Sequence, residues 1–292
     1  MKNKKLLLLL LLSLAFFDCK KTGIESTCPS DEIILSSQSQ IDNFSTNYPG
    51  CTQILGNITI DESLNGNITN LLGLSQITSI EGSLTVELND ALTSLSGLNN
   101  LTFIGGGLNV IANYALTNLS GLDNLTTIGG FLELRENTSL TNLNGLDNLT
   151  SIEGDLNVYQ NAALTNLNGL DNLTSIGGYL YLRENNALTS LNGLGNVTSI
   201  GEYLSLTSNV ALANMNGLDN LIFIGGNLMV HNNDAMINLN GAGSLTSIGG
   251  NVRVHENDAM TNLSGVGSLI AIEGNLWVHD NEAMVTIAAW II

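Results

Sequence analysis

The 292-residue sequence contains few residues that break, cross-link or charge a chain. It has two prolines, three cysteines and eight lysines and arginines, and only 5% of its residues are aromatic. The formal net charge is −18, from 8 basic and 26 acidic residues. Because phosphate binding requires basic patches, this charge excludes nucleic acid and anionic membrane surfaces as partners of the folded body. From Ile68 onward, apolar residues never keep a helical spacing long enough to form a proper helix.

What the sequence does contain is a 24-residue repeat that runs from Ile68 almost to the C-terminus. The unit reads roughly N-x-A-L-T-N-L-x-G-L-D-N-L-T-S-I-G-G-x-L-x-V-x-x. A unit this short cannot bury its own apolar side chains, so neighbouring units must stack and share one core. An unbroken asparagine series marks the same corner of every unit: Asn89, Asn113, Asn137, Asn161, Asn185, Asn209, Asn233, Asn257 and Asn281.

The apolar pattern within each unit predicts β-structure. Leu132 and Leu134 alternate with outward-facing neighbours, which is the period of a strand, and the pattern breaks at Gly129-Gly130. Each turn is predicted to contribute one short parallel strand and a second, looser extended segment. Counting Ile58 and Ile60 as the first strand, ten strand positions stacked at about 4.8 Å give a rod of roughly 45 Å. The predicted fold class is mainly β, a parallel β-solenoid of about ten turns.

We interpret the asparagine and glycine series as structural. An amide at the same corner of every turn can bond the backbone of its own bend and of the next turn. The Gly-Gly pairs are not phosphate loops, because no helix pattern follows them. No cofactor is predicted. A second glycine series suits bends with positive φ or close backbone approach: Gly73, Gly97, Gly121, Gly145, Gly169, Gly193, Gly217, Gly241 and Gly265.

Residues 1–18 have the pattern of a signal peptide. Three lysines precede an apolar run that is shorter than a typical membrane span. Cys19 follows at once and resembles the lipid-modified cysteine of bacterial lipoproteins, although residues 16–18 lack the small residue that this motif prefers. The alternatives are a lipid anchor at Cys19 and a poorly cleaved signal with an incidental cysteine. We expect an exported protein at the cell surface or outer membrane, lipid-anchored or otherwise secreted, with residues 19–27 as a linker.

Residues 28–57 are predicted to form an N-terminal cap on the open end of the solenoid. In an oxidising compartment, the remaining cysteines Cys28 and Cys51 are most simply a disulfide. Residues 32–35 have the pattern of a strand, and Ser37 with Gln40 has the spacing of a capping box. A short helix with two apolar residues on one face would follow and end before residue 49.

The solenoid is predicted to span residues 58–284. Residues 285–292 form an apolar tail that departs from the repeat. A solenoid needs its last turn covered. The tail therefore either folds over the end, pairs with another chain in self-association, or marks a truncated version of a longer protein.

The cap and the repeats together resemble the receptor L domain family. The resemblance rests on Cys51-Thr-Gln-Ile-Leu-Gly-Asn-Ile-Thr-Ile60 and on units such as Leu146-x-x-Leu149-x-x-Ile152. That family is related to leucine-rich repeats and includes ligand-binding lobes of growth-factor and insulin receptors and many bacterial surface proteins. The resemblance covers about residues 28–284 and implies a right-handed β-solenoid closed by a disulfide-linked cap. Without a cysteine-rich module, membrane helix or kinase signature, it favours a bacterial surface protein over a signalling receptor.

The candidate binding residues lie at outward-facing strand positions, where the repeat permits variation. These positions hold four of the six tyrosines, all three arginines and all three histidines. Exposed tyrosine with arginine is typical of interaction hot spots, and flat aromatic surfaces also suit sugar rings. Arg135 and Arg183 are expected to flank the ring of Tyr159. The predicted ligand-binding residues are Phe131, Arg135, Tyr159, Tyr179, Tyr181, Arg183 and Tyr203.

The predicted partner of this face is an extracellular glycan or protein, recognised without chemistry. The alternative is that aromatic residues with good strand propensity and Arg–Tyr stacks only stabilise an exposed sheet. The protein would then be a structural spacer or shaft with no specific ligand.

His231, His255 and His279 form a second column on successive turns. Imidazoles about 5 Å apart could converge on one ion such as zinc. The three turns also share an Ala-Met pair, so duplication alone accounts for the register, and a metal site is the weaker alternative. Stacked histidines near carboxylates also titrate near neutrality.

A polysaccharide-cleaving β-helix enzyme is the least favoured function. Its candidate carboxylates would be Asp123, Asp147, Asp171 and Asp219. Each lies in the same Gly-Leu-Asp-Asn-Leu bend, where short polar side chains cap turns. A catalytic pair needs two carboxylates in different environments, and these are equivalent copies. No catalytic residue is predicted.

Overall fold

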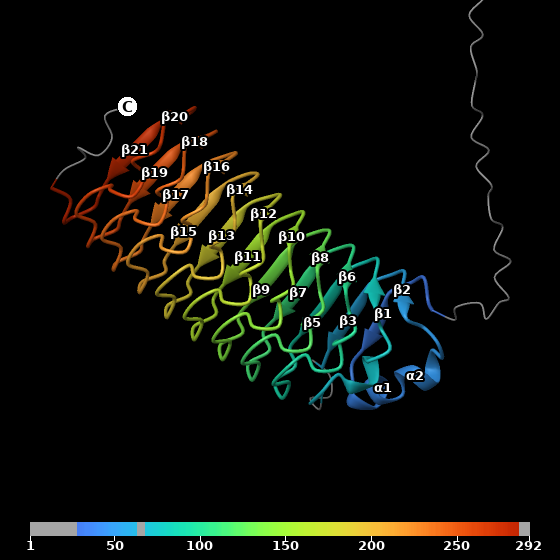
Figure 1. Cartoon of the computed structure of the whole chain (residues 1–292). Coiled ribbons are helices and arrows are strands. Elements are labelled where there is room, and N and C mark those ends of the chain that lie inside the picture. The colour runs from blue at the N-terminus through green and yellow to red at the C-terminus, as the bar shows by residue number, and fades with distance from the viewer. Residues whose placement is uncertain (1–27, 63–67, 286–292) are drawn as a thin grey trace, which may run out of the picture.

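Each 24-residue unit forms one turn of a parallel β-solenoid, and the turns stack along an elongated rod (Figure 1). The computed structural model describes residues 28–62 and 68–285. The predicted signal peptide, Cys19 and residues 286–292 lie outside the described residues. Within the described ranges, no helix is long and apolar enough to cross a membrane.

The Leu-x-Val segments form an eleven-stranded parallel sheet, which we call the long-strand sheet. Along most of its strands, the first and third residues are buried and the second and fourth face outward. The ten predicted strand positions are the odd-numbered strands from β3 to β21, and the N-terminal cap adds β1. The strands are β1 (Ile33–Leu35), β3 (Ile58–Asp61), β5 (Leu84–Glu87), β7 (Leu108–Ile111), β9 (Leu132–Arg135), β11 (Leu156–Tyr159), β13 (Leu180–Arg183), β15 (Leu204–Thr207), β17 (Leu228–His231), β19 (Val252–His255) and β21 (Leu276–His279).

The predicted second, looser segment of each turn is a two-residue strand. These segments form a ten-stranded parallel sheet, the short-strand sheet. It forms the second row of arrows along the rod in Figure 1. Its strands are β2 (Gln53–Ile54), β4 (Ser79–Ile80), β6 (Phe103–Ile104), β8 (Thr127–Ile128), β10 (Ser151–Ile152), β12 (Ser175–Ile176), β14 (Ser199–Ile200), β16 (Phe223–Ile224), β18 (Ser247–Ile248) and β20 (Ala271–Ile272).

One continuous core of leucine, isoleucine and valine runs the length of the solenoid. Leu156 lies opposite Leu132 on one side and Leu180 on the other, so the register between these turns is 24 residues. Each apolar side chain therefore packs against its own equivalent in the neighbouring turns. The solenoid prediction is confirmed.

The N-terminal cap has the predicted Cys28–Cys51 disulfide. The Ser37 side chain accepts a hydrogen bond from the Gln40 N–H, as the capping box requires. The Gln40 side chain instead accepts from the Ser36 N–H at 2.7 Å. The predicted single helix is divided into α1 (Gln38–Asp42) and α2 (Phe44–Asn47), which pack against the 3₁₀ turn η1 (Leu72–Leu74).

The buried asparagine series forms a ladder between turns. Nδ2 of Asn185 donates to the Val158 carbonyl at 2.8 Å, and its Oδ1 accepts from the Asn161 N–H at 3.1 Å. The same bonds recur from Asn113 to Asn281, where all the side chains are buried. The structural role is confirmed. The side chain bonds the backbone of the preceding turn, whereas we expected it to bond the backbone of the next turn.

Two kinds of left-handed bend close each turn. The glycine series from Gly97 to Gly265 has φ between 104° and 121°, as predicted. A Cβ atom at Gly169 would overlap the Leu143 carbonyl, so both conformation and space require glycine there. The residue before each ladder asparagine also has positive φ, between 51° and 59°, and none of these is glycine: Leu88, Ala112, Glu136, Gln160, Glu184, Ser208, Asn232, Glu256 and Asp280.

Replacing one ladder asparagine should destabilise the solenoid far more than replacing its neighbour. Asn185→Ala leaves the Asn161 N–H and the Val158 carbonyl buried and unpaired, which should cost about 2–4 kcal/mol of unfolding free energy. Asn186→Ala is the matched control, because Asn186 is exposed and its side chain makes no hydrogen bond with another described residue. Urea unfolding measures both. Equal losses in the two variants would contradict the ladder's role.

Candidate functional site

All seven predicted ligand-binding residues lie on the outward face of the long-strand sheet, on or beside β9, β11, β13 and β15. In the register, Arg135 lies opposite Tyr159, which lies opposite Arg183. We call the seven residues the tyrosine–arginine cluster: Phe131, Arg135, Tyr159, Tyr179, Tyr181, Arg183 and Tyr203.

Two tyrosines of the cluster stack face to face. The ring centroids of Tyr179 and Tyr203 are 4.4 Å apart, and the rings are inclined by 7°. The Asn157 amide donates to the Tyr179 hydroxyl at 3.3 Å, and the Tyr179 N–H donates to Asp155 Oδ1. Burial, together with Tyr179, raises the pKa of Tyr203 to about 12. Both rings are thus held in place, and the Tyr203 hydroxyl stays protonated at neutral pH.

Tyr159 lies between an acidic and a basic side chain. Its hydroxyl donates to Glu133 Oε1 at 2.8 Å, and the Arg135 guanidinium carbon lies 5.9 Å from its ring centroid. Burial and the hydrogen bond to Glu133 raise the pKa of Tyr159. Arg135 Nε also lies 3.5 Å from Glu136 Oε1, so its charge is partly compensated.

Arg183 does not complete the expected sandwich around Tyr159. Its Nη2 lies 2.6 Å from Glu184 Oε1, and its Nη1 donates to the Tyr181 hydroxyl at 3.4 Å. The adjacent carboxylate at the bend attracts the guanidinium away from the strand column. Because each arginine has a neighbouring carboxylate, the cluster offers aromatic and polar contacts with little net charge.

Two buried polar side chains on β15 lie between this cluster and the histidines. Ser205 and Thr207 face outward, but only 2% and 7% of their surfaces are exposed. The Thr207 hydroxyl lies 3.0 Å from Ser205 Oγ and 3.0 Å from His231 Nε2. Sequence analysis missed this link, because the contact depends on side-chain rotamers.

The three histidines form a stack of parallel rings. Centroids of successive rings are 4.9 Å apart, and each pair is inclined by 5°. Arg253 lies over the Trp277 ring on the same sheet, 4.7 Å from its centroid. Parallel rings hold their nitrogens side by side, so a shared ion would require other rotamers. In residues 28–62 and 68–285, no group of three His, Cys, Asp or Glu side chains is arranged to hold a metal ion.

The four repeated aspartates cap turns, as predicted. Asp147 Oδ2 accepts from the Gly145 N–H at 2.8 Å, and Asp123, Asp171 and Asp219 make the same bond. A shallow groove of about 430 Å³ lies beside Asp171 and Asp219. Equivalent carboxylates with the same backbone partner do not provide the separate acid and base that glycoside cleavage needs.

The fold is a β-solenoid with an ordered outward face, which fits a ligand-recognition role. The receptor L domain family model matches the chain twice, at residues 50–125 and 116–192, and over these residues the chain belongs to the receptor L domain family. The second match contains six of the seven cluster residues. The comparisons with curated proteins and with solved structures found no match. The family and the disulfide fit an extracellular, non-enzymatic recognition role with a protein partner in general.

Stability should depend on pH through His231. Burial, with His255 and Arg183, lowers the pKa of His231, while Glu256 raises it. The unfolded chain, with a pKa of about 6.5, binds the proton more readily, so this histidine destabilises the fold as pH falls below that value. His231→Gln keeps a donor near Thr207 and removes the titration.

Thermal unfolding at about pH 7.5 and pH 5.5 checks this expectation. On acidification, the melting temperature of the parent should fall by more than that of His231→Gln. His279→Gln is the matched control, because His279 is the most exposed ring of the stack. The melting temperature of this variant should fall as much as that of the parent. The same loss in parent and His231→Gln would contradict the assignment.

Proposed function

We propose that the protein is an exported surface protein that recognises or adheres to an extracellular protein through the tyrosine–arginine cluster. One observation carries the proposal. A chain with 5% aromatic residues and a net charge of −18 gathers four of its six tyrosines and two of its three arginines on neighbouring strands of one face. Tyrosine and arginine are the residues most enriched at interaction hot spots.

The contacts within the cluster support a preorganised binding surface. The Tyr179–Tyr203 stack and the Tyr159–Glu133 hydrogen bond fix three rings. The Tyr159 and Tyr181 ring centroids are 6.2 Å apart, so the aromatic surface continues across strands. Side chains ordered before binding lose less entropy when a partner docks.

A glycan is the second candidate ligand, and the Tyr179–Tyr203 stack favours it. Flat aromatic rings beside polar groups match the apolar faces and hydroxyls of sugar rings. The protein candidate has the additional support of the receptor L domain family, whose members bind protein ligands.

Export belongs to the same proposal. The Cys28–Cys51 disulfide supports an oxidising compartment. Anchoring at the cell surface or outer membrane would use a lipid on Cys19, and self-association would use the apolar tail at residues 285–292. Mass spectrometry of the membrane fraction, with Cys19→Ser as control, tests the anchor.

Binding to arrayed host matrix proteins and glycans tests the ligand-binding face. The test variant combines Arg135→Ala, Tyr159→Ala, Tyr181→Ala and Arg183→Ala. We expect it to lose at least about tenfold in affinity, because truncated hot-spot residues typically cost this much.

A matched control changes four outward-facing residues of the short-strand sheet: Thr127→Ala, Ser151→Ala, Ser175→Ala and Ser199→Ala. Both variants must keep the parent's circular dichroism and melting temperature. The control should bind like the parent. If the parent binds nothing, or if both variants bind equally well, a structural spacer or shaft is the better account.

A further inference from the structure

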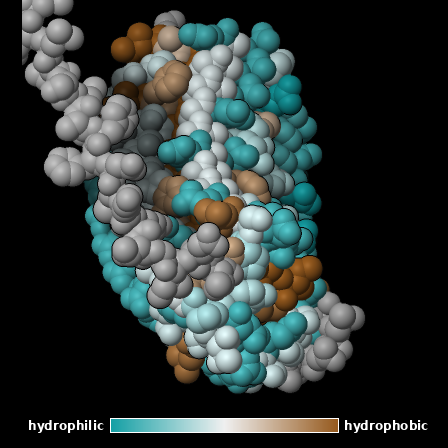
Figure 2. All heavy atoms as spheres, turned by 90° about the vertical axis from the view of Figure 1, so that its right-hand side faces the viewer, coloured by the Kyte–Doolittle hydropathy of each residue, from teal (hydrophilic) through white to brown (hydrophobic). Residues whose placement is uncertain are grey.

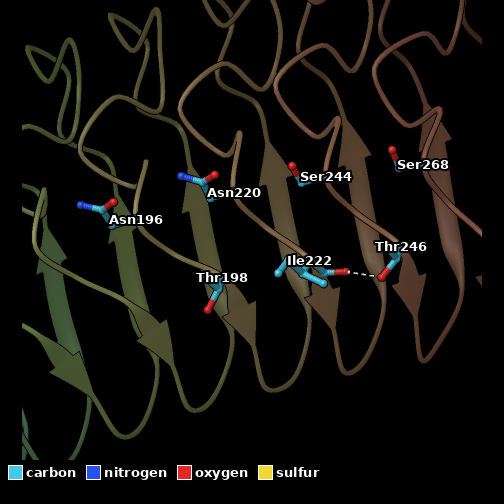
Figure 3. A pocket seen from close by; sticks show the side chains of 7 residues that line it. All are labelled: Asn196, Thr198, Asn220, Ile222, Ser244, Thr246 and Ser268. Carbon is cyan, nitrogen blue, oxygen red and sulfur yellow. Dashed lines mark hydrogen bonds between the residues drawn. The ribbon is translucent and has the colours of Figure 1, made fainter.

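A groove of about 480 Å³ lies away from the tyrosine–arginine cluster, at the bends that lead into β14, β16 and β18 (Figure 3). Two rows of side chains line it, one from each of two positions in the repeat. The first row is Asn196, Asn220, Ser244 and Ser268, and the second is Thr198, Ile222 and Thr246. Neither row has a role in the proposed binding face.

The groove opens where a second asparagine row stops. In six earlier turns, the asparagine Nδ2 donates to a carbonyl 25 residues before it, at 2.6–2.8 Å; Asn220, for example, donates to Gly195. Ser244 and Ser268 replace the next two asparagines and are too short to reach. Within the described residues, the carbonyls of Asp219 and Gly243 do not receive this bond.

A second substitution accompanies the loss of each asparagine, at the residue just before it. The Asp-Asn pair of the repeat becomes Gly-Ser at residues 243–244 and again at 267–268. A Cβ atom added at Gly243 or Gly267 would meet nothing within 4 Å. The backbone does not require glycine at either position, so both can accept the aspartate of the repeat.

The groove combines an apolar floor with hydrogen-bond acceptors. Ile222 takes the place of a repeat threonine and is 48% exposed. Thr246 is bonded back to the Ile222 carbonyl at 3.1 Å, as Figure 3 shows. Nδ2 of Asn196 and of Asn220 is already bonded to a carbonyl, so their Oδ1 atoms remain as acceptors.

Figure 2 shows, on another face of the molecule, that polar and neutral residues cover most of the surface and that apolar residues gather in separate patches. Ile222 is one of several exposed apolar side chains among the described residues. All three arginines lie at outward positions of the long-strand sheet, so no described lysine or arginine lines the groove. The groove therefore suits a ligand that donates hydrogen bonds and carries no negative charge.

We propose that this groove binds a neutral oligosaccharide. Sugar hydroxyls would donate to the asparagine, serine and carbonyl oxygens, and the apolar face of a ring would pack on Ile222. Four turns at about 4.8 Å spacing give a length of about 14 Å, which fits an extended chain of sugars better than a single ring. The site is independent of the tyrosine–arginine cluster.

The repeat itself provides the test variant. Gly243→Asp with Ser244→Asn restores the Asp-Asn pair and puts the larger asparagine side chain into the groove lining at residue 244. Asp219 accepts from the Gly217 N–H at 3.2 Å in the preceding turn, and the new aspartate can cap Gly241 in the same way. The refilled protein should therefore be at least as thermally stable as the parent. Ile222→Thr, which restores the repeat threonine, removes the apolar floor as a second variant.

Amide NMR titrations of the full chain measure binding. The probes are linear hexasaccharides of glucose (α-1,4 and β-1,4), xylose, mannose and N-acetylglucosamine, with spermine as a cationic comparison. We expect at least one hexasaccharide to shift the amides of Asn220, Ile222 and Ser244 at millimolar concentration. Both groove variants should weaken this binding at least about tenfold.

The quadruple variant of the tyrosine–arginine cluster should bind the hexasaccharide as the parent does, so the two proposals can fail separately. The groove proposal is wrong if no hexasaccharide shifts these amides, if only spermine does, or if the refilled protein binds as tightly as the parent.

Discussion

Hydrogen bonding between successive turns is the constraint on which the rest of the structure depends. The two parallel sheets join the straight segments of successive turns, and the asparagine ladder joins the bends that follow the long strands. Without the ladder, the N–H of Asn161 and the carbonyl of Val158 would be buried without partners. Because every turn must match its neighbours atom by atom, the backbone enforces the 24-residue period. Only outward-facing side chains are free to differ, and the tyrosine–arginine cluster and the histidine stack lie there.

The fold was predictable because this constraint repeats in the sequence. The asparagine series, the Cys28–Cys51 disulfide and the Ser37 cap each have a local or periodic signature, and all are present. The left-handed residues before each ladder asparagine were not predictable. Leu88, Glu136 and Ser208 are chemically different residues, yet all have positive φ. Their conformation follows from the geometry of the corner rather than from an intrinsic backbone preference.

The candidate site was predictable as a face but not as a set of contacts. Strand alternation places Tyr159 and Arg183 outward in the same column, whereas rotamers decide that Arg183 contacts Glu184. The groove had a signal in the sequence, the replacement of Asp-Asn by Gly-Ser at residues 243–244. That signal has meaning only once the structure shows that the asparagine side chain closes the bend.

Because the register is constant, the solenoid fixes the distances between the features on its surface as well as supporting them. Because each turn contacts mainly its neighbours, a whole unit can be inserted or deleted without remodelling the others. Such a change would move the histidine stack relative to the tyrosine–arginine cluster by one step of about 4.8 Å and leave both arrangements intact. The distance between two recognition elements on this rod can therefore change only in whole steps, and a partner that spans both would have to match that spacing.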